Sequence, residues 1–220
     1  MFFPEAFNSR SLLAFIGEAG CGKTILAQKV GWALEGEGFQ VDAIADDVKE
    51  IETLLTSKAF VVLDNCDHMG QVKKQTSLLC RVCTGGQITR RMLYSNNSAV
   101  SFPLISNVVI TAISGGFLRD TLASRTLIIP LKPRNRQAQS GGHNFQRTAT
   151  ASRNAVMTEM SGRAKNILAA LEVQAGYRHL EDTRLQDFTG FIMRCAIHEG
   201  WAHGGRRNAA VARVGGTPPY

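Results

Sequence analysis

Residues 11–38 read "SLLAFIGEAGCGKTILAQKVGWALEGEG". The stretch begins with an apolar run typical of a buried strand, continues through a glycine-rich loop, and ends in a segment rich in alanine and leucine that is typical of a helix. It contains the pattern G-x-x-x-x-G-K-[ST] at Gly17, Gly22, Lys23 and Thr24. A phosphate-binding loop needs this pattern in this strand–loop–helix setting. The stretch therefore predicts a nucleotide-binding α/β domain.

The residue types in the loop match the chemistry of phosphate binding. Glycines let backbone N–H groups close around phosphate oxygens, and the start of the following helix carries a partial positive charge. We expect Lys23 to reach the β and γ phosphates of ATP and the Thr24 hydroxyl to ligate Mg²⁺. The predicted nucleotide-binding residues are Gly17, Glu18, Ala19, Gly20, Cys21, Gly22, Lys23 and Thr24.

A second strand with an acidic end follows in "KAFVVLDNCDH", residues 58–68. Residues 59–63 are continuously apolar, as expected of a strand buried on both faces. Asp64 is the expected Mg²⁺ partner, through water. Many ATPases place a glutamate at the next position to polarise the attacking water. Asn65 stands there, and an amide orients water but cannot accept its proton. Asp67 is either a substitute base or a solvated turn residue.

Two further segments complete the predicted sheet. "LISNVVITAISGG" (104–116) predicts a buried strand at 107–111 with Thr111 at its polar end. "FLRDTLASRTLIIPL" (117–131) predicts a short helix carrying Arg119 and Arg125 and then another strand. Four or five apolar strands alternating with helices predict a parallel α/β sheet sandwiched by helices, with its site at the carboxyl ends of the strands.

Composition limits the class of protein. The chain has 220 residues, 44% of them hydrophobic, and no apolar run long enough to span a bilayer. The five cysteines cannot all pair and lie in apolar segments, which indicates reduced thiols and a cytoplasmic protein. Cys80 and Cys83 form C-x-x-C without a second pair, which favours packing over zinc binding. The net charge of +7 fits a polyanionic partner or an ordinary basic enzyme.

We expect four regions along the chain. Residues 1–132 would form the P-loop ATPase core, and 133–153, which are polar and basic, a linker or loop. Helical periodicity resumes at 154, so 154–204 would form a small helical lid region. Residues 205–220 would be a disordered tail.

A β-hairpin is predicted between the Asp64 and Thr111 strands. In "RRMLYSNNSAVSFPL" (90–104), residues 92–94 and 99–102 would be the arms and 95–98 the turn. The paired glycines at 85 and 86 would let the chain turn sharply away from the preceding helix.

These motifs occur together in an order that resembles a known family. Gly17 to Thr24, Asp64–Asn65, "TGGQITRRMLY" (84–94), Thr111 and "RDTLASRTLIIPL" (119–131) are similar to the superfamily 3 helicase-like AAA+ ATPases of phages, prophages and mobile elements, which are related to poxvirus-type primase-helicases. The resemblance covers about residues 11–200. The loop motif is very specific, the two later motifs are moderately specific, and the helical end is weakly so.

The resemblance implies roles at matching positions. Thr111 stands where the family has a sensor asparagine for the γ-phosphate. Arg125 takes the place of an arginine presented to a neighbouring subunit's nucleotide, which implies a homo-oligomeric ring, expected to be a hexamer. The local alternative is that Arg125 caps its helix or pairs with Asp120. The implied catalytic set is Lys23, Asp64, Asn65, Thr111 and Arg125.

The resemblance also places the hairpin in the central channel. Arg90 and Arg91 would then contact the DNA backbone, and Tyr94 would stack on a base. The alternative is that the arginines bind an acidic face of a neighbouring subunit. Arg163 and Arg184 are candidates for a nucleotide-sensing arginine in the lid.

Three function classes are consistent with the sequence. The leading one is a nucleic-acid-dependent ATPase motor, a ring-forming helicase or translocase acting on single- or double-stranded DNA in mobile-element or phage replication. The second is an ATP-controlled assembly switch, in phage defence or transposition. The third is a small-molecule P-loop kinase.

Overall fold

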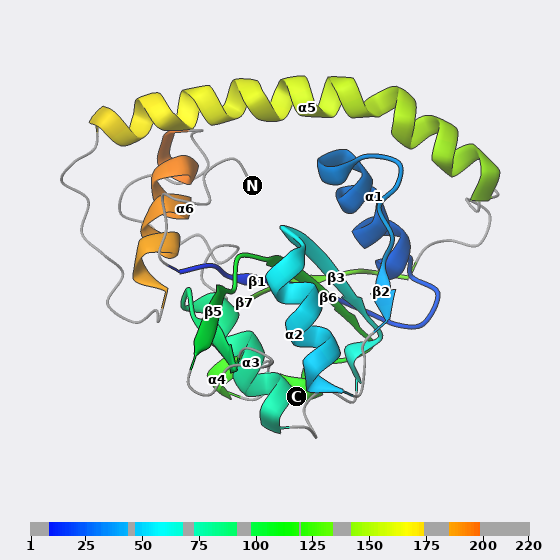
Figure 1. The fold of residues 1–220 in the computed structure, drawn as a ribbon. Coiled ribbons are helices and arrows are strands. Elements are labelled where there is room, and N and C mark those ends of the chain that lie inside the picture. Colours follow the sequence, from blue (N-terminus) through cyan, green and yellow to red (C-terminus); the bar gives the residue numbers. More distant parts are fainter. Residues whose placement is uncertain are drawn as a thin grey trace.

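The computed structural model describes residues 9–43, 47–67, 73–91, 98–118, 120–133, 142–173 and 185–198. Its centre is one five-stranded sheet in which every neighbouring pair is parallel (Figure 1). The spatial order is β2 (Asp42–Ala43), β3 (Phe60–Asp64), β6 (Asn107–Ala112), β1 (Leu12–Ile16) and β7 (Thr126–Pro130). The predicted parallel α/β sheet is confirmed.

The central strands are buried because their side chains are apolar on both faces. The first four residues of β3 are fully buried, and so are the last five of β6. The edge strand β7 is different, since Ile128 and Ile129 are half-exposed and the strand ends at Pro130. A proline fits an edge because it has no N–H to donate to a further strand.

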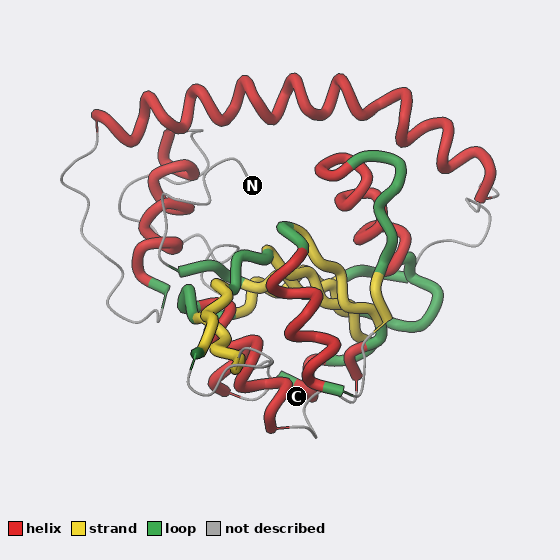
Figure 2. Tube along the Cα trace, viewed as in Figure 1, coloured by secondary structure: helices red, strands yellow, loops and turns green. Residues whose placement is uncertain are grey.

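Helices cover both faces of the sheet (Figure 2). On one face α1 (Lys23–Glu35) packs through a cluster that includes Trp32, Phe39 and Phe60, with the two phenylalanine rings 5.5 Å apart. On the other face lie α2 (Val48–Ser57), α3 (Lys73–Cys83) and the short α4 (Asp120–Ala123). A second hydrophobic cluster joins these three helices to the sheet, so the core has two layers separated by the strands.

The predicted hairpin exists, with a different first arm. Strand β4 (Gln87–Arg91) pairs antiparallel with β5 (Ala99–Pro103). The first arm is thus 87–91, whereas the predicted arm at 92–94 lies outside the described residues. The glycine turn is confirmed, because Gly85 has φ 68° and the Gly86 N–H bonds the Arg81 carbonyl at 2.9 Å, which closes the end of α3.

Two helices follow the sheet. The first, α5 (Gly142–Val173), arches over the α1 side of the molecule, and α6 (Gln186–His198) packs against it (Figure 1). The prediction of a linker over 133–153 was wrong for 142–153, which are helical. The polar composition of this segment gave no periodic apolar pattern, and a helix does not need an apolar stripe along its whole length. The helix contacts α1, because Arg153 Nε donates a hydrogen bond to the Trp32 carbonyl at 3.3 Å.

The start of α6 is tied to the segment before β1. The Asp187 carboxylate accepts a hydrogen bond from the Ser9 N–H at 3.1 Å and another from the Ser9 hydroxyl. Partial burial acts to raise the pKa of Asp187, but these hydrogen bonds and one from the Phe188 N–H outweigh burial, so the pKa is lowered from 3.8.

The described helices include none that is long and apolar enough to cross a membrane. The division into core and lid stays a prediction, and the expected disordered tail at 205–220 lies outside the described residues.

Candidate functional site

The glycine-rich loop joins the carboxyl end of β1 to α1. Gly22 caps α1 with φ 94°, in the left-handed region that glycine tolerates at no steric cost. Gly17 is needed for a different reason, since a Cβ there would lie 2.5 Å from the Leu131 carbonyl oxygen. In the described part of the chain, the N–H groups of Gly22, Lys23 and Thr24 have no acceptor. Unpaired donors at a helix start are suited to an anion.

Lys23 folds back over this loop. Its Nζ lies 2.7 Å from the Gly17 carbonyl oxygen, 2.9 Å from that of Glu18 and 3.9 Å from the Cys21 Sγ. The ammonium group is therefore held beside the unpaired N–H donors. Together they form a small positively charged surface at the carboxyl edge of the sheet.

Asp64 and Thr24 meet although they are 40 residues apart. The Thr24 hydroxyl donates to Asp64 Oδ1 at 2.8 Å. The sheet produces this contact, because β3 and β1 lie on either side of β6 and both end at the same edge. A hydroxyl and a carboxylate are the hard oxygen donors that Mg²⁺ prefers, and Mg²⁺ usually takes one or two carboxylates plus water and substrate phosphates. The residues present therefore fit the metal.

Thr111 lies behind Asp64. Its side chain is buried at 1% exposure, its hydroxyl donates to Asp64 Oδ1, and the Asn65 N–H donates to it at 3.1 Å. Thr111 is thus a positioning residue for the carboxylate. Its predicted role as a sensor of the γ-phosphate stays a prediction.

The two residues considered for activating water have different surroundings. Asn65 is exposed and has φ 58°, a left-handed conformation that asparagine adopts more readily than most residues. Asp67 Oδ1 accepts the N–H groups of Ile113 at 2.8 Å and Ser114 at 3.4 Å, while its Oδ2 is buried without a partner among the described residues. Asp67 therefore fastens the end of β3 to the loop after β6, and the choice between a substitute base and a turn residue stays a prediction.

Two buried thiols, those of Cys66 and Cys83, are shifted away from the reactive thiolate form. Burial, and secondly the charges of Asp64 and Asp67, raise the pKa of Cys66. Burial also raises the pKa of Cys83 from 9.0 to about 12, with a smaller contribution from Cys80. Cys83 is fully buried in the core, so the packing interpretation of the C-x-x-C pair is confirmed for it.

Arg125 lies at the opposite edge of the sheet. It directly precedes β7, whose first residue, Thr126, pairs with Leu12 at the start of β1. Its Nη1 donates to the Thr121 carbonyl, and its Nε is buried without a partner in the described part of the chain. This geometry agrees with the helix-capping alternative. The role toward a neighbouring subunit stays a prediction, and Arg119 lies outside the described residues.

Arg90 and Arg91 point to opposite faces of the hairpin. Side chains alternate along a strand, and Arg90 shares the face of the buried Ile88. Arg90 Nη2 forms an ion pair with Glu52 of α2 at 3.3 Å, and Arg91 lies on the other, exposed face. The ion pair and the strand alternation give the two arginines different surroundings, and their predicted contact with DNA stays a prediction. Tyr94 lies outside the described residues.

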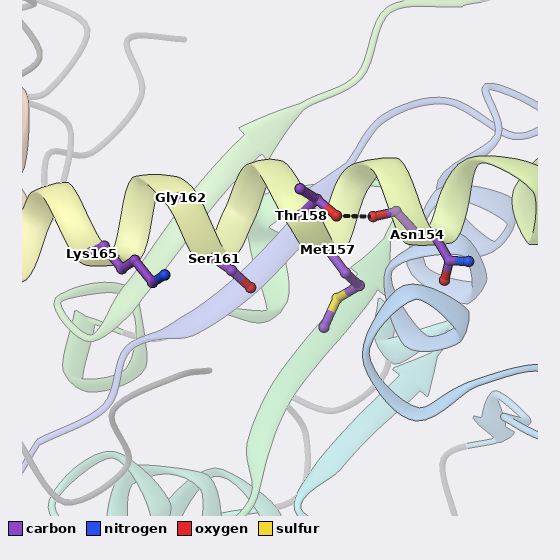
Figure 3. Close-up of a pocket in the computed structure, with 6 residues that line it drawn as sticks. All are labelled: Asn154, Met157, Thr158, Ser161, Gly162 and Lys165. Atoms are coloured by element: carbon purple, nitrogen blue, oxygen red, sulfur yellow. Dashed lines mark hydrogen bonds between the residues drawn. The ribbon is translucent and has the colours of Figure 1, made fainter.

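The long helix α5 carries one of the predicted lid arginines and a shallow hollow. Arg163 pairs with Glu159 one turn earlier, at 2.8 Å. Arg184 lies outside the described residues. Figure 3 shows the hollow, where Met157, Ser161 and Lys165 extend from one side of the helix. The lining residues that the structure describes all come from α5, and Lys165 is the charged one among them.

A group of basic residues on α3 is among the features that were not predicted from the sequence. Lys73, Lys74 and Arg81 line a second hollow between α2 and α3. The available signal was the recurrence of cations on the polar face of an amphipathic segment.

These features define a parallel α/β domain with a glycine-rich loop, a lysine, a hydroxyl and a carboxylate gathered at the carboxyl edge of its sheet. No model of a protein family matches the sequence, and no curated protein matches it either. Among solved structures, the A form apo structure of the NrS-1 C-terminal region is similar, with a TM-score of 0.45 and 15% identity over 65% of this chain and 34% of that one. A second structure of that region has a TM-score of 0.39 and 13% identity over 65% and 33%. The chain spans about a third of the length of these structures, and the similarity is a distant one of fold.

Proposed function

We propose that this protein is a nucleic-acid-dependent ATPase, a ring-forming DNA helicase or translocase of mobile-element or phage replication. The observation that carries the proposal is the 2.8 Å contact between the Thr24 hydroxyl and Asp64, directly beside the glycine loop. ATP hydrolysis requires hydrogen-bond donors that bind the phosphates and oxygen ligands for Mg²⁺ close beside them, and both kinds of group lie at this edge of the sheet.

In this proposal each part of the site has a task. The loop N–H groups and Lys23 hold the β and γ phosphates, while Thr24 and Asp64 hold Mg²⁺, which neutralises charge on the phosphates. Thr111 keeps the Asp64 carboxylate in place through its hydroxyl. Asn65, exposed beside this carboxylate, orients the attacking water.

The test is ATP turnover measured with and without single- and double-stranded DNA, together with mass by light scattering. Lys23→Ala should abolish turnover and leave the fold intact, because Lys23 bonds only loop atoms among the described residues. Losing the ammonium should cost several kcal/mol in the transition state, at least about 3 kcal/mol by comparison with single oxyanion donors. Undiminished turnover in this variant would remove the proposal.

The ATP-controlled assembly switch is the second candidate, and one observation favours it. Asn65 rather than a glutamate follows Asp64, and Oδ1 of Asp67 accepts the N–H groups of Ile113 and Ser114, which leaves only its buried Oδ2 without a partner among the described residues. A carboxylate that is buried and held by the backbone in this way is a poor general base for the attacking water, so hydrolysis would be slow. Tight ATP binding and ATP-dependent assembly with negligible turnover, with or without DNA, would favour the switch over the motor.

A further inference from the structure

The hollow between α2 and α3 lies on the face of the sheet opposite α1 and α5. It has a volume of about 330 Å³. Lys73, Lys74, Ser77 and Arg81 of α3 form one wall, and Glu52 of α2 contributes the opposing polar group. None of these residues contacts Asp64 or the glycine loop through a hydrogen bond or ion pair that the described residues make, so the hollow is separate from the site above.

Its charge is strongly positive. Among the described residues three cations and one carboxylate line it, and the carboxylate, Glu52, already pairs with Arg90 at 3.3 Å. Within the described residues, no acidic side chain lies within ion-pair distance of Lys73, Lys74 or Arg81. The two lysines are exposed, whereas Arg81 is fixed by donating from Nη2 to the Gln87 carbonyl. Like charges gathered without acidic partners repel one another and attract an anion.

The layout suits a chain of anions better than a single one. Lys73 and Arg81 are eight residues apart on one helix, which corresponds to about 12 Å along its axis. Arg90 extends the basic surface onto the hairpin, because its ion pair with Glu52 links β4 to the rim of the hollow. An extended row of cations with one adjacent hydroxyl matches phosphates repeated along a backbone.

We propose that the hollow between α2 and α3, called the basic groove from here on, binds the phosphate backbone of a nucleic-acid strand through Lys73, Lys74 and Arg81. Glu52 holds Arg90 at the rim and limits the affinity. The inference rests on the proposed function only in taking nucleic acid as the partner.

The first test is oligonucleotide binding by Lys73→Ala/Lys74→Ala, measured by fluorescence anisotropy with a single strand of about 30 nucleotides, without nucleotide and over a range of salt. Two lost phosphate contacts should lower the salt slope by about 1.4, at about 0.7 per contact. The affinity lost between about 50 and 200 mM salt should then be about sevenfold smaller than in the wild type. The control Lys49→Ala/Lys165→Ala removes the same charge from exposed positions outside the groove and should keep the wild-type slope.

The second test uses a variant that should strengthen DNA binding rather than weaken it. Glu52→Gln removes the carboxylate from the groove, and it should tighten binding by about twofold or more at low salt. A variant that merely disturbed the fold would weaken binding instead.

Three outcomes would overturn the proposal. One is a wild-type salt slope in the lysine variant. Another is an equal loss of slope in the control. The third is unchanged DNA affinity with loss of oligomers, which would assign the groove to a second copy of the chain. If the salt slope of DNA binding falls in the lysine variant while no form of the protein turns over ATP, the groove proposal is supported and the proposed ATPase fails. If the protein shows normal DNA-stimulated turnover but the lysine variant keeps the wild-type salt slope, the proposed ATPase is supported and the groove proposal fails.

Discussion

Replacing Thr111 by valine isolates the hydroxyl that positions Asp64. Valine has nearly the same shape, so packing at this buried position is retained. The change removes the hydrogen bond to the Asp64 carboxylate and leaves the Asn65 N–H without its acceptor. A hydrogen bond to a charged group contributes about 1.5–3 kcal/mol, so the free energy of unfolding should fall by about 2–3 kcal/mol.

The same change should also weaken Mg²⁺ binding at the site, which is an effect separate from the loss of stability. A residue that orients a metal-binding carboxylate typically contributes about 10–100-fold to metal affinity or activity. We therefore expect the Mg²⁺ concentration that supports half-maximal binding of a fluorescent ATP analogue to rise by about that factor. Urea unfolding without Mg²⁺ measures the stability effect separately. Thr111→Ser keeps the hydroxyl and should retain most of the Mg²⁺ affinity.

Thr126 supplies a matched control on β7, which is separated from β6 by β1 in the same sheet. Its hydroxyl is equally buried and donates to the Leu122 carbonyl at 2.7 Å, at the opposite edge of the sheet. Thr126→Val should lower stability by about 1 kcal/mol and leave the Mg²⁺ dependence unchanged. The reasoning is refuted if Thr111→Val keeps the wild-type Mg²⁺ dependence, or if Thr111→Ser and Thr126→Val lose as much Mg²⁺ affinity as Thr111→Val does.

Three further predictions concern other parts of the chain. Arg125→Ala should reduce ATP turnover by about 10³-fold or more and spare ATP binding, with partial recovery on mixing with Lys23→Ala; a loss of stability alone would leave Arg125 as a helix cap. Arg91→Ala should lower the DNA salt slope by about 0.7, and an unchanged slope would exclude that face of the hairpin from binding. The lowered pKa of Asp187 means that its contribution to stability is present above pH 3.8 and is lost as the pH falls through its folded-state pKa. Urea unfolding should therefore find Asp187→Asn less stable than the wild type at neutral pH and equally stable in strong acid, and a difference that persists in acid would contradict this reasoning.

The local features of the site followed from the sequence alone. The loop from Gly17 to Thr24 could be predicted because its conformation depends on neighbouring residues, namely glycines at left-handed positions and a helix that begins directly after them. The buried strand that ends in Asp64 was equally clear, since a continuous apolar run is required of a strand covered on both faces. Parallel pairing then placed both features at one edge of the sheet.

Only the tertiary structure decided which side chains face one another. The contact of Thr111 with Asp64, and of Asp67 with the loop after β6, depends on the register between β3 and β6, which no local pattern specifies. The separation of Arg90 from Arg91 depends on which face of β4 is buried, because a shift of one residue would exchange the two. Likewise, the basic groove exists because α2 and α3 pack side by side on the sheet. The sequence determined the chemistry that is available, and packing determined which of its groups come together.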